Sequence, residues 1–241
     1  MLPVHSIETF GTHEGPGIRL VVFTQGCHFR CLYCHNPDTQ ALSGGTAMRI
    51  EDIVKLAEKQ KAYFGADGGV TVSGGEPTIH AQALIRLFKA LHAKGIRTAL
   101  DTNGALLNED TKKLYAETDL ILLDTKHIDE DKHRALTGMS NHNTLALAQY
   151  RESTSKPMWL RYVLVPGYSD DEIDILRIGE HFEKYHCIDR IEILPYHTLG
   201  AYKYEKLGRK NPLKGTDMPS KESIERTKAI FERYFKKVTV R

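Results

Sequence analysis

Three of the four cysteines in this 241-residue chain lie within eight positions, in the order Cys27, Cys31 and Cys34. They follow the apolar run 20–23, which predicts a β-strand, so one loop supplies three sulfur ligands. Thiolates grouped in this way bind iron–sulfur clusters or zinc, and a set of three leaves one iron of a four-iron cluster without a protein ligand. The cysteine spacing by itself leaves both kinds of metal site open.

Glycines and polar residues follow five further apolar strands, at the positions where these strands end. They occur at Ser73 to Pro77, Asp101 to Gly104, Asp124 to His127, Pro166 to Gly167 and Pro195 to His197. Because the carboxyl ends of parallel strands meet at one edge of a sheet, we expect these residues and the cysteines to serve one site. Paired glycines admit close backbone contact with a ligand, and acids beside a lysine favour a charged or zwitterionic ligand.

The elements that position these residues alternate between strand and helix. Strands are predicted at 4–10, 18–24, 69–73, 96–100, 120–123, 158–165 and 190–194. Helices are predicted at 50–64, 81–94, 109–117, 129–136, 145–153, 170–186 and 221–234, the last capped by Ser220. Such alternation predicts a parallel sheet with helices outside it.

From residue 18 onward the pattern gives six strand–helix units, whereas a closed eightfold barrel takes about 250 residues and eight units. We therefore expect an α/β fold in the form of an incomplete (β/α)6 barrel, TIM-like, with a parallel sheet that is open on one side. No linker rich in Pro, Gly or Ser interrupts the chain, so residues 1–241 are expected to form a single domain.

Composition narrows the class of partner and the compartment. The 33 Lys and Arg against 31 Asp and Glu give a net charge of +2, which predicts no general attraction to nucleic acid or to a membrane. The sequence has no secretory pattern and no apolar run of roughly 18 residues, so a cytoplasmic protein is expected. Crowded cysteines favour a metal site in a reducing compartment over disulfides, and the isolated Cys187 is interpreted as a buried apolar residue.

The motifs resemble those of a known superfamily. The cysteine triplet, with Tyr33 before the last cysteine, resembles the signature of the radical S-adenosylmethionine enzymes, and Ser73 to Pro77 resembles their element for the methionine amino group. Over nearly the whole chain, five motifs resemble the activating enzymes of glycyl-radical enzymes. These motifs are Gly15 to Arg19, Cys31 to Asn36, Leu100 to Gly104, Leu123 to Lys126 and Leu194 to His197.

This resemblance implies a radical reaction. The three cysteines would hold a [4Fe–4S] cluster whose fourth iron binds the amino and carboxylate groups of S-adenosylmethionine. One electron would cleave the sulfonium bond, and the resulting 5′-deoxyadenosyl radical would take a hydrogen atom from a glycine of the partner enzyme. The implied partner is pyruvate formate-lyase, whose glycine loop would enter through the open side of the barrel, with flavodoxin or ferredoxin as electron donor. A monomer is expected.

The resemblance also implies roles for individual residues. Tyr33, Cys34 and His35 would lie beside the adenine, and Gly74, Gly75 and Glu76 beside the methionine amino group. Asp101 and Lys126 would hold the methionine end with catalytic importance, Asp124 and Thr125 would contact the cofactor, and His197 would contact the nucleoside. Asp101, Thr102 and Asp124 would supply oxygens to a monovalent cation, Na⁺ or K⁺. Arg161, Tyr162 and Asp101 would contact the incoming glycine loop.

Two departures and several alternatives accompany this interpretation. Glu14 stands where the family more usually has Asp, and the chain lacks the cysteine-rich insert of several other activators. The basic segment Lys203, Lys206, Arg209, Lys210 and Lys214 would either steer a partner or electron donor or form a solvated surface. Alternative functions are activation of another glycyl-radical enzyme, radical chemistry on a small molecule as in a deazapurine synthase, or a zinc-stabilised binding module in which His28 or His35 completes four ligands.

Overall fold

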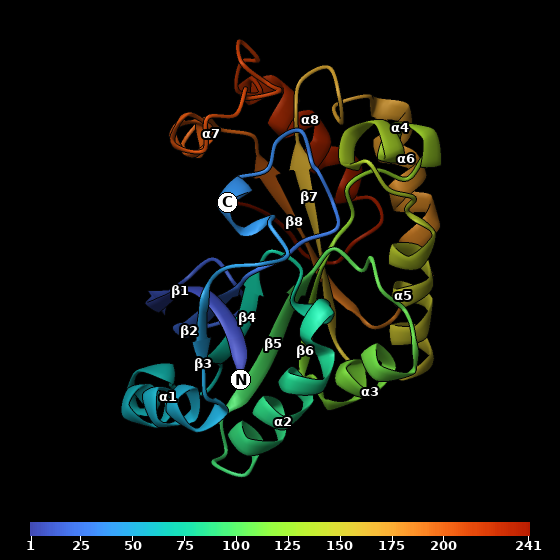
Figure 1. Ribbon diagram of the computed structural model, residues 1–241. Helices are drawn as coiled ribbons and strands as arrows, with labels where there is room; N and C mark the ends of the chain where they lie inside the picture. Colours follow the sequence, from blue (N-terminus) through green and yellow to red (C-terminus); the bar gives the residue numbers. More distant parts are fainter. The chain divides into compact units, whose positions relative to one another are not determined.

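The computed structural model describes residues 1–241 and divides into two compact units (Figure 1). The first unit contains Met1–His28 and Thr39–Leu122, and the second contains Phe29–Asp38 and Leu123–Arg241. The cysteine loop therefore contributes to both units, with Cys27 in the first and with Cys31 and Cys34 in the second.

The first unit is built on five strands in the order β3, β1, β2, β4, β5. Their bounds are β1 (Leu2–Gly11), β2 (Arg19–Thr24), β3 (Thr46–Met48), β4 (Gly69–Gly74) and β5 (Arg97–Thr102). The β2, β4 and β5 strands run parallel, whereas β1 pairs antiparallel with both β2 and β3. The register joins Thr24 to Gly74 and Val72 to Leu100, so the carboxyl ends of these parallel strands lie at one edge of the sheet.

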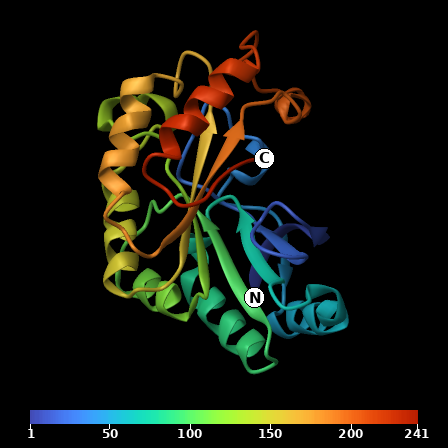
Figure 2. The same cartoon turned by 180° about the vertical axis from the view of Figure 1, so that it is seen from behind.

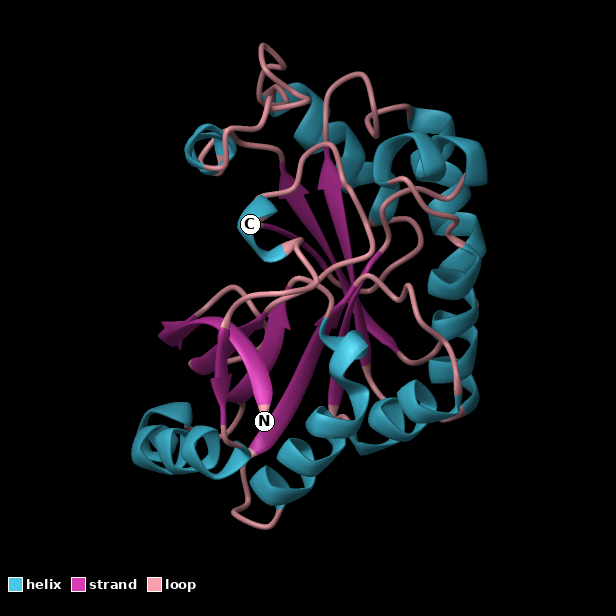
Figure 3. Cartoon of the chain, in the orientation of Figure 1, coloured by secondary structure: helices cyan, strands magenta, loops and turns pink.

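Three helices and a short 3₁₀ turn complete the first unit: α1 (Ile50–Phe64), η2 (Pro77–His80), α2 (Ala81–His92) and α3 (Glu109–Glu117). Figure 3 shows α1 and α2 beside the strands, where α1 contacts β2 and β4 and α2 contacts β5. Leu84, Leu87 and Leu91 recur at helical spacing on α2 and are fully buried. Each such side chain contributes about 2 kcal/mol of burial free energy, which fixes α2 on the sheet.

The second unit contains three neighbouring parallel strands, β7 (Met158–Leu164), β8 (Ile188–Pro195) and β9 (Val238–Val240). Its helices are α4 (Glu130–Thr137), α5 (His142–Ser153), α6 (Glu172–Phe182), α7 (Ala201–Lys206) and α8 (Lys221–Phe231). Seen from behind in Figure 2, α6 and α8 lie side by side, and α8 also contacts β8 and β9. The side chains of Asp129, Asp171 and Ser220 accept hydrogen bonds from first-turn amides and so begin α4, α6 and α8.

The predicted fold class is confirmed: the chain is an α/β protein with a mostly parallel, open sheet that does not close into a barrel. The six predicted strand–helix units begin at β2, β4, β5, β6 (Leu120–Asp124), β7 and β8. The short elements β3, η1 (Pro37–Thr39), β9 and α7 carry too few residues to show a period and were not predicted. The expectation of a single domain over residues 1–241 stays a prediction. None of the helices combines the length and the apolar character that crossing a membrane requires.

Candidate active site

Cys27 lies just beyond the end of β2 and is held by a neighbouring segment of the first unit. The amide of Gly26 donates a hydrogen bond to the carbonyl of Thr39 (2.7 Å), and the amide of Cys27 donates to the carbonyl of Gln40 (3.3 Å). The Cys27 side chain is only 8% exposed. The first cysteine of the motif is therefore a buried thiol on a backbone that the protein fixes before any metal binds.

Gly74 and Gly75 bring the end of β4 against the residues that precede Cys27. The amide of Glu76 donates a hydrogen bond to the carbonyl of Gly26 at 2.7 Å. A Cβ atom on Gly75 would lie 2.1 Å from that same carbonyl oxygen, and Gly74 adopts a φ of +110°. Because neither position accommodates a side chain, the glycine pair makes the close approach of the two strand ends possible.

Glu76 is fully buried and joins the end of β4 to the end of β5. Its carboxylate accepts hydrogen bonds from the amide and Oγ1 of Thr78 (3.0 and 2.6 Å), from Oγ1 of Thr102 (2.7 Å) and from the amide of Asn103 (2.9 Å). Burial raises the pKa of Glu76, and these hydrogen bonds oppose the rise. The Glu76 side chain thus fixes the turn that follows β5.

Asp101 is the half-buried acid at this edge of the first unit. Its Oδ2 accepts a hydrogen bond from Oγ of Ser73 at 2.7 Å, which joins β5 to β4. The neighbouring Thr102 is buried, and its Oγ1 accepts a hydrogen bond from the amide of Gly104 at 3.0 Å. Of the predicted residues on this turn, Asp101 therefore retains exposed surface, whereas Thr102 is engaged inside the turn.

The second unit holds the remaining two cysteines against α4. The amides of Arg30 and Leu32 donate hydrogen bonds to the last carbonyls of α4 (2.7 and 3.0 Å), and the amide of Cys34 donates to the carbonyl of Cys31 (3.1 Å). Burial raises the pKa of the Cys31 thiol to about 12. A metal that binds Cys31 must therefore displace a tightly held proton, because cysteine binds metals as the thiolate.

Helix α7 anchors the end of the cysteine loop. The Tyr204 hydroxyl donates a hydrogen bond to the carbonyl of Cys34 at 3.1 Å. The Lys203 ammonium donates to Oδ1 of Asn36 at 2.7 Å and forms an ion pair with Asp38 at 3.2 Å. Part of the basic segment predicted to steer a partner therefore positions the cysteine loop from about 170 residues away.

A small pocket lined by Cys34 brings together two distant stretches of predicted site residues. Tyr33, Cys34 and His35 line it together with Tyr196 and His197. The rings of His35 and His197 meet edge to face with 4.7 Å between their centroids. Burial and the nearby His197 lower the pKa of His35, so this ring is neutral at neutral pH.

Tyr33 presents a polar atom that the protein leaves unsatisfied. Its ring packs against the buried cluster of Val165, Tyr196 and Leu213, and its hydroxyl oxygen is buried without a hydrogen-bond partner. Buried polar groups in proteins are generally paired, so an orphaned hydroxyl beside a pocket suits a polar group of a ligand.

Lys126 and Asp124 form a close ion pair at the end of β6. The Lys126 ammonium lies 2.6 Å from Oδ2 of Asp124 and 5.4 Å from the centroid of the Tyr33 ring. Burial disfavours the ammonium, but Asp124, Tyr33 and Cys31 together outweigh this effect and raise the pKa of Lys126 well above its ordinary value. Between them, Thr125 donates hydrogen bonds from its amide and Oγ1 to the carbonyl of Arg161 (2.9 and 3.1 Å). The protein thus keeps a positive charge in place at this strand end.

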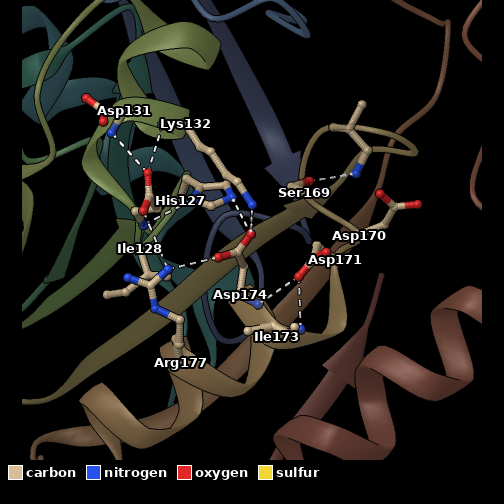
Figure 4. Close-up of polar contacts among 12 residues, drawn as sticks. His127, Ile128, Asp131, Lys132, Ser169, Asp170, Asp171, Ile173, Asp174 and Arg177 are labelled. Atoms are coloured by element: carbon tan, nitrogen blue, oxygen red, sulfur yellow. Dashed lines mark hydrogen bonds and ion pairs between the residues drawn. The ribbon is translucent and has the colours of Figure 1, made fainter.

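The segment that follows β6 is anchored by a polar cluster around the buried Asp174 (Figure 4). Nδ1 of His127 accepts a hydrogen bond from the amide of Asp129 at 3.0 Å, and Nε2 lies 3.4 Å from Oδ2 of Asp174. Lys132 donates to the same carboxylate, and Arg177 lies 3.1 Å from its other oxygen. This cluster joins α4 to α6 behind the segment.

Two residues for which the sequence predicted no individual role contact the cysteines, whereas the predicted role of Tyr162 is wrong. Asn103 donates from Nδ2 to Sγ of Cys27 at 3.7 Å, and Tyr204 binds the carbonyl of Cys34. No spacing rule predicts such contacts, because the partners lie 76 and 170 positions apart. Tyr162, by contrast, is fully buried against Phe231 of α8, so it belongs to the core and does not meet an incoming loop.

The groups that each unit supplies suit a cluster and an organic ligand. The first unit supplies the Cys27 thiol with an amide donor at its sulfur, and thiols suit iron–sulfur ligation. The second unit supplies the thiols of Cys31 and Cys34 and the orphaned hydroxyl of Tyr33, which suits a polar group of a small molecule. Within neither unit do three His, Cys, Asp or Glu side chains lie close enough together to hold a single metal ion. His35, considered as a fourth zinc ligand, packs against His197 instead.

Comparison with known proteins agrees with this chemistry. The model of the Radical SAM superfamily matches residues 21–177. The chain is 44% identical over 248 residues to the pyruvate formate-lyase-activating enzyme of Streptococcus mutans, covering 98% of this chain and 94% of that protein. It is 43% identical over 238 residues to the pyruvate formate-lyase 1-activating enzyme of Escherichia coli strain K12, covering 98% of this chain and 97% of that protein.

Solved structures show the same fold. A domain of the pyruvate-formate lyase-activating enzyme from Bacteroides vulgatus matches with a TM-score of 0.61 and 26% identity, covering 72% of this chain and 99% of that one. SuiB of Streptococcus suis, bound to its precursor peptide SuiA, matches in fold with a TM-score of 0.73 at 18% identity, over 98% of this chain and 50% of that one. The chain therefore belongs to the radical SAM superfamily and, within it, to the family of the pyruvate formate-lyase-activating enzymes.

Proposed function

We propose that this chain activates pyruvate formate-lyase by installing a glycyl radical in it. The observation that carries the proposal is the identity of 43–45% to pyruvate formate-lyase-activating enzymes over 92–98% of the chain. Membership of the superfamily implies a [4Fe–4S] cluster and S-adenosylmethionine. When bound, these two groups supply a 5′-deoxyadenosyl radical that can remove a hydrogen atom from the α-carbon of a glycine.

Cys27, Cys31 and Cys34 are the proposed ligands of the cluster. None of the three forms a disulfide, and the backbone of each part of their loop is hydrogen-bonded to its own unit. A metal would provide the positive charge that a buried thiolate at Cys27 or Cys31 requires, in place of the proton that burial retains on the Cys31 thiol.

The second unit supplies the proposed contacts to the nucleoside and the methionine carboxylate. Tyr33, Cys34, His35 and His197 share one pocket, which supports their assignment to the adenosine part of the cofactor. Lys126 carries a positive charge suited to a carboxylate. Asp124 keeps that charge in place, and Thr125 fixes the backbone between them.

The first unit supplies the proposed contacts to the methionine amino group. Because the carboxylate of Glu76 is engaged by protein donors, the contribution of Gly74, Gly75 and Glu76 to an ammonium group would come through backbone carbonyls. Asp101 is half-buried at the end of β5, and its carboxylate, whose Oδ2 accepts from Ser73, would attract a cationic group of the cofactor.

A monovalent cation, Na⁺ or K⁺, remains part of the proposal. Oxygen ligands suit such a hard cation, and Asp101, Thr102 and Asp124 supply oxygens at strand ends. Since Asp124 already pairs with Lys126 and Thr102 with Glu76, the cation would bind beside these interactions. Activity that is equal in Na⁺, K⁺ and a bulky organic cation of the same ionic strength would argue against this site.

The proposed protein partners are pyruvate formate-lyase, as the substrate, and a flavodoxin or ferredoxin, as the electron donor. The chain itself is proposed to be a monomer. Arg161, the candidate for contacting the glycine loop, is buried and lies 3.4 Å from Glu192 on β8. Of the basic segment, Lys206, Lys210 and Lys214 are exposed and available to an acidic partner. Reversal of these three charges should slow activation more at low salt than at high salt, and a salt-independent effect would exclude steering.

The chemistry is tested by anaerobic purification followed by iron, sulfide and zinc analysis and by visible absorption. The reduced protein is expected to hold a four-iron cluster and to cleave S-adenosylmethionine to methionine and 5′-deoxyadenosine. Cys31→Ala should remove both properties, whereas Cys187→Ala, the matched control outside the loop, should retain them. Colourless protein with stoichiometric zinc would overturn the assignment.

A further inference from the structure

Asn103 holds a fixed orientation beside the first cysteine of the motif. Its Oδ1 accepts a hydrogen bond from the amide of Ala105 at 2.9 Å. An amide N–H can only donate, so this contact assigns the oxygen end of the side chain to Ala105 and the NH₂ end to the other side. On that side, Nδ2 lies 3.7 Å from Sγ of Cys27, a distance that suits an N–H to sulfur hydrogen bond.

The backbone of Asn103 is fixed as firmly as its side chain. Its amide donates to Oε2 of Glu76 at 2.9 Å, and the preceding Thr102 donates to Oε1 of the same carboxylate at 2.7 Å. Glu76 is fully buried, and Asn103 and Cys27 are only 6% and 8% exposed. Water therefore competes poorly for the sulfur, and the donor reaches it without further rearrangement.

We propose that Asn103 is a positioning residue that donates a hydrogen bond to the Cys27 thiolate and thereby raises the reduction potential of the bound cluster. The proposal rests on the cysteine assignment given under Proposed function. A hydrogen bond to a cluster sulfur stabilises negative charge, and the reduced cluster carries one more negative charge than the oxidised cluster. The protein thus eases the one-electron reduction that precedes cofactor cleavage. The same donor also holds the Cys27 side chain in the ligand position.

Redox titration of the anaerobically loaded protein, followed by electron paramagnetic resonance of the reduced cluster, tests this proposal. Asn103→Leu keeps the size of the side chain and removes both polar ends. Asn103→Asp keeps an oxygen for the amide of Ala105 and removes the donor, and its carboxylate also adds a negative charge near the sulfur. It is the second variant if Asn103→Leu folds poorly. Thr78→Val is the matched control, because it removes a hydrogen bond to Glu76 and leaves the contact with Cys27.

Asn103→Leu is expected to reduce the equilibrium constant for cluster reduction by about tenfold, which corresponds to a potential about 59 mV lower for a one-electron couple. Asn103→Asp should lower the potential by at least as much, because its carboxylate adds a negative charge near the sulfur. Thr78→Val should be less stable and should keep the wild-type potential. Loss of iron from both Asn103 variants, at a thermal stability equal to that of Thr78→Val, would also support the contact. Wild-type potentials in both Asn103 variants, or an equal shift in Thr78→Val, would overturn the proposal. Wild-type protein that assembles no cluster would instead overturn the proposed function.

Discussion

Gly75 is the position at which a single methyl group should do the most damage to the site. In Gly75→Ala the new Cβ would lie 2.1 Å from the carbonyl oxygen and 2.7 Å from the carbonyl carbon of Gly26. Both atoms are backbone, so neither can rotate away. The end of β4 must therefore separate from the segment that carries Cys27. This weakens the two hydrogen bonds that join them, from the amide of Gly75 to the carbonyl of Thr24 and from the amide of Glu76 to the carbonyl of Gly26.

The cost can be worked from these contacts. Overpacking costs about 1–3 kcal/mol, and each weakened hydrogen bond costs about 1 kcal/mol. Gly75→Ala should therefore lower the free energy of unfolding by about 4 kcal/mol. It should also lower the iron content after anaerobic reconstitution, because the displaced backbone belongs to the residue before Cys27.

Gly95→Ala provides the matched control. Gly95 ends α2 at the opposite end of β5, has a φ of +62°, and would bring a new Cβ no closer than 3.5 Å to the end of the Lys61 side chain. Its cost should be that of the left-handed backbone alone, about 1–2 kcal/mol. Urea unfolding of the metal-free variants and iron analysis of the reconstituted ones measure both effects. If Gly75→Ala is destabilised no more than Gly95→Ala and retains its full iron content, the contact of Gly75 with the Gly26 carbonyl does not control the site.

Three further predictions concern the supports of the site. Glu76→Gln should lose about 2–3 kcal/mol in urea unfolding, because its NH₂ group would face a donor; wild-type stability would contradict this. Tyr204→Phe should lose about 1 kcal/mol and release iron to a chelator faster, whereas unchanged release would show that α7 does not hold the loop. His133 of α4 is fully buried, and its ring meets that of Phe29 in the cysteine loop edge to face. Burial lowers the pKa of His133 to about 4, so the neutral ring's contribution to stability is complete above pH 6.5 and is lost as the pH falls toward 4. Unfolding curves measured over this range should show a loss of about 3 kcal/mol at most that is absent in His133→Leu, and the same pH dependence in both proteins would contradict this role.

Sequence patterns predicted the parallel part of the fold because its signals are local. The run Leu20 to Val22 consists of consecutive apolar residues that are buried in the strand. The leucines of α2 recur at helical spacing and are buried as well. Strands β3 and β9 have three residues each, which is too short for any period to appear. Helix α7 was interpreted as part of a basic surface, because nothing local showed that Lys203 binds Asn36 and Asp38.

In the candidate site too, the sequence predicted the local motifs but not the contacts between distant residues. The cysteines and strand-end acids were found because each motif is contiguous, and the resemblance to a family supplied their roles. Glu76 illustrates what the motif could not show: its side chain serves the turn after β5, as only the hydrogen bonds to Thr102 and Asn103 reveal. Tyr162 was selected beside Arg161, but adjacent residues on a strand point to opposite faces, and Tyr162 faces the core.

We propose that this chain removes a hydrogen atom from a glycine of pyruvate formate-lyase and so installs a radical there. The most direct measurement mixes the reduced, cluster-loaded protein with S-adenosylmethionine and pyruvate formate-lyase, and records the electron paramagnetic resonance spectrum under strict anaerobiosis. We expect a glycyl radical signal that requires all three components and is absent when the partner's radical glycine is replaced by alanine. Cleavage of S-adenosylmethionine with no radical on pyruvate formate-lyase, and a signal on a different glycyl-radical enzyme, would contradict the assigned substrate.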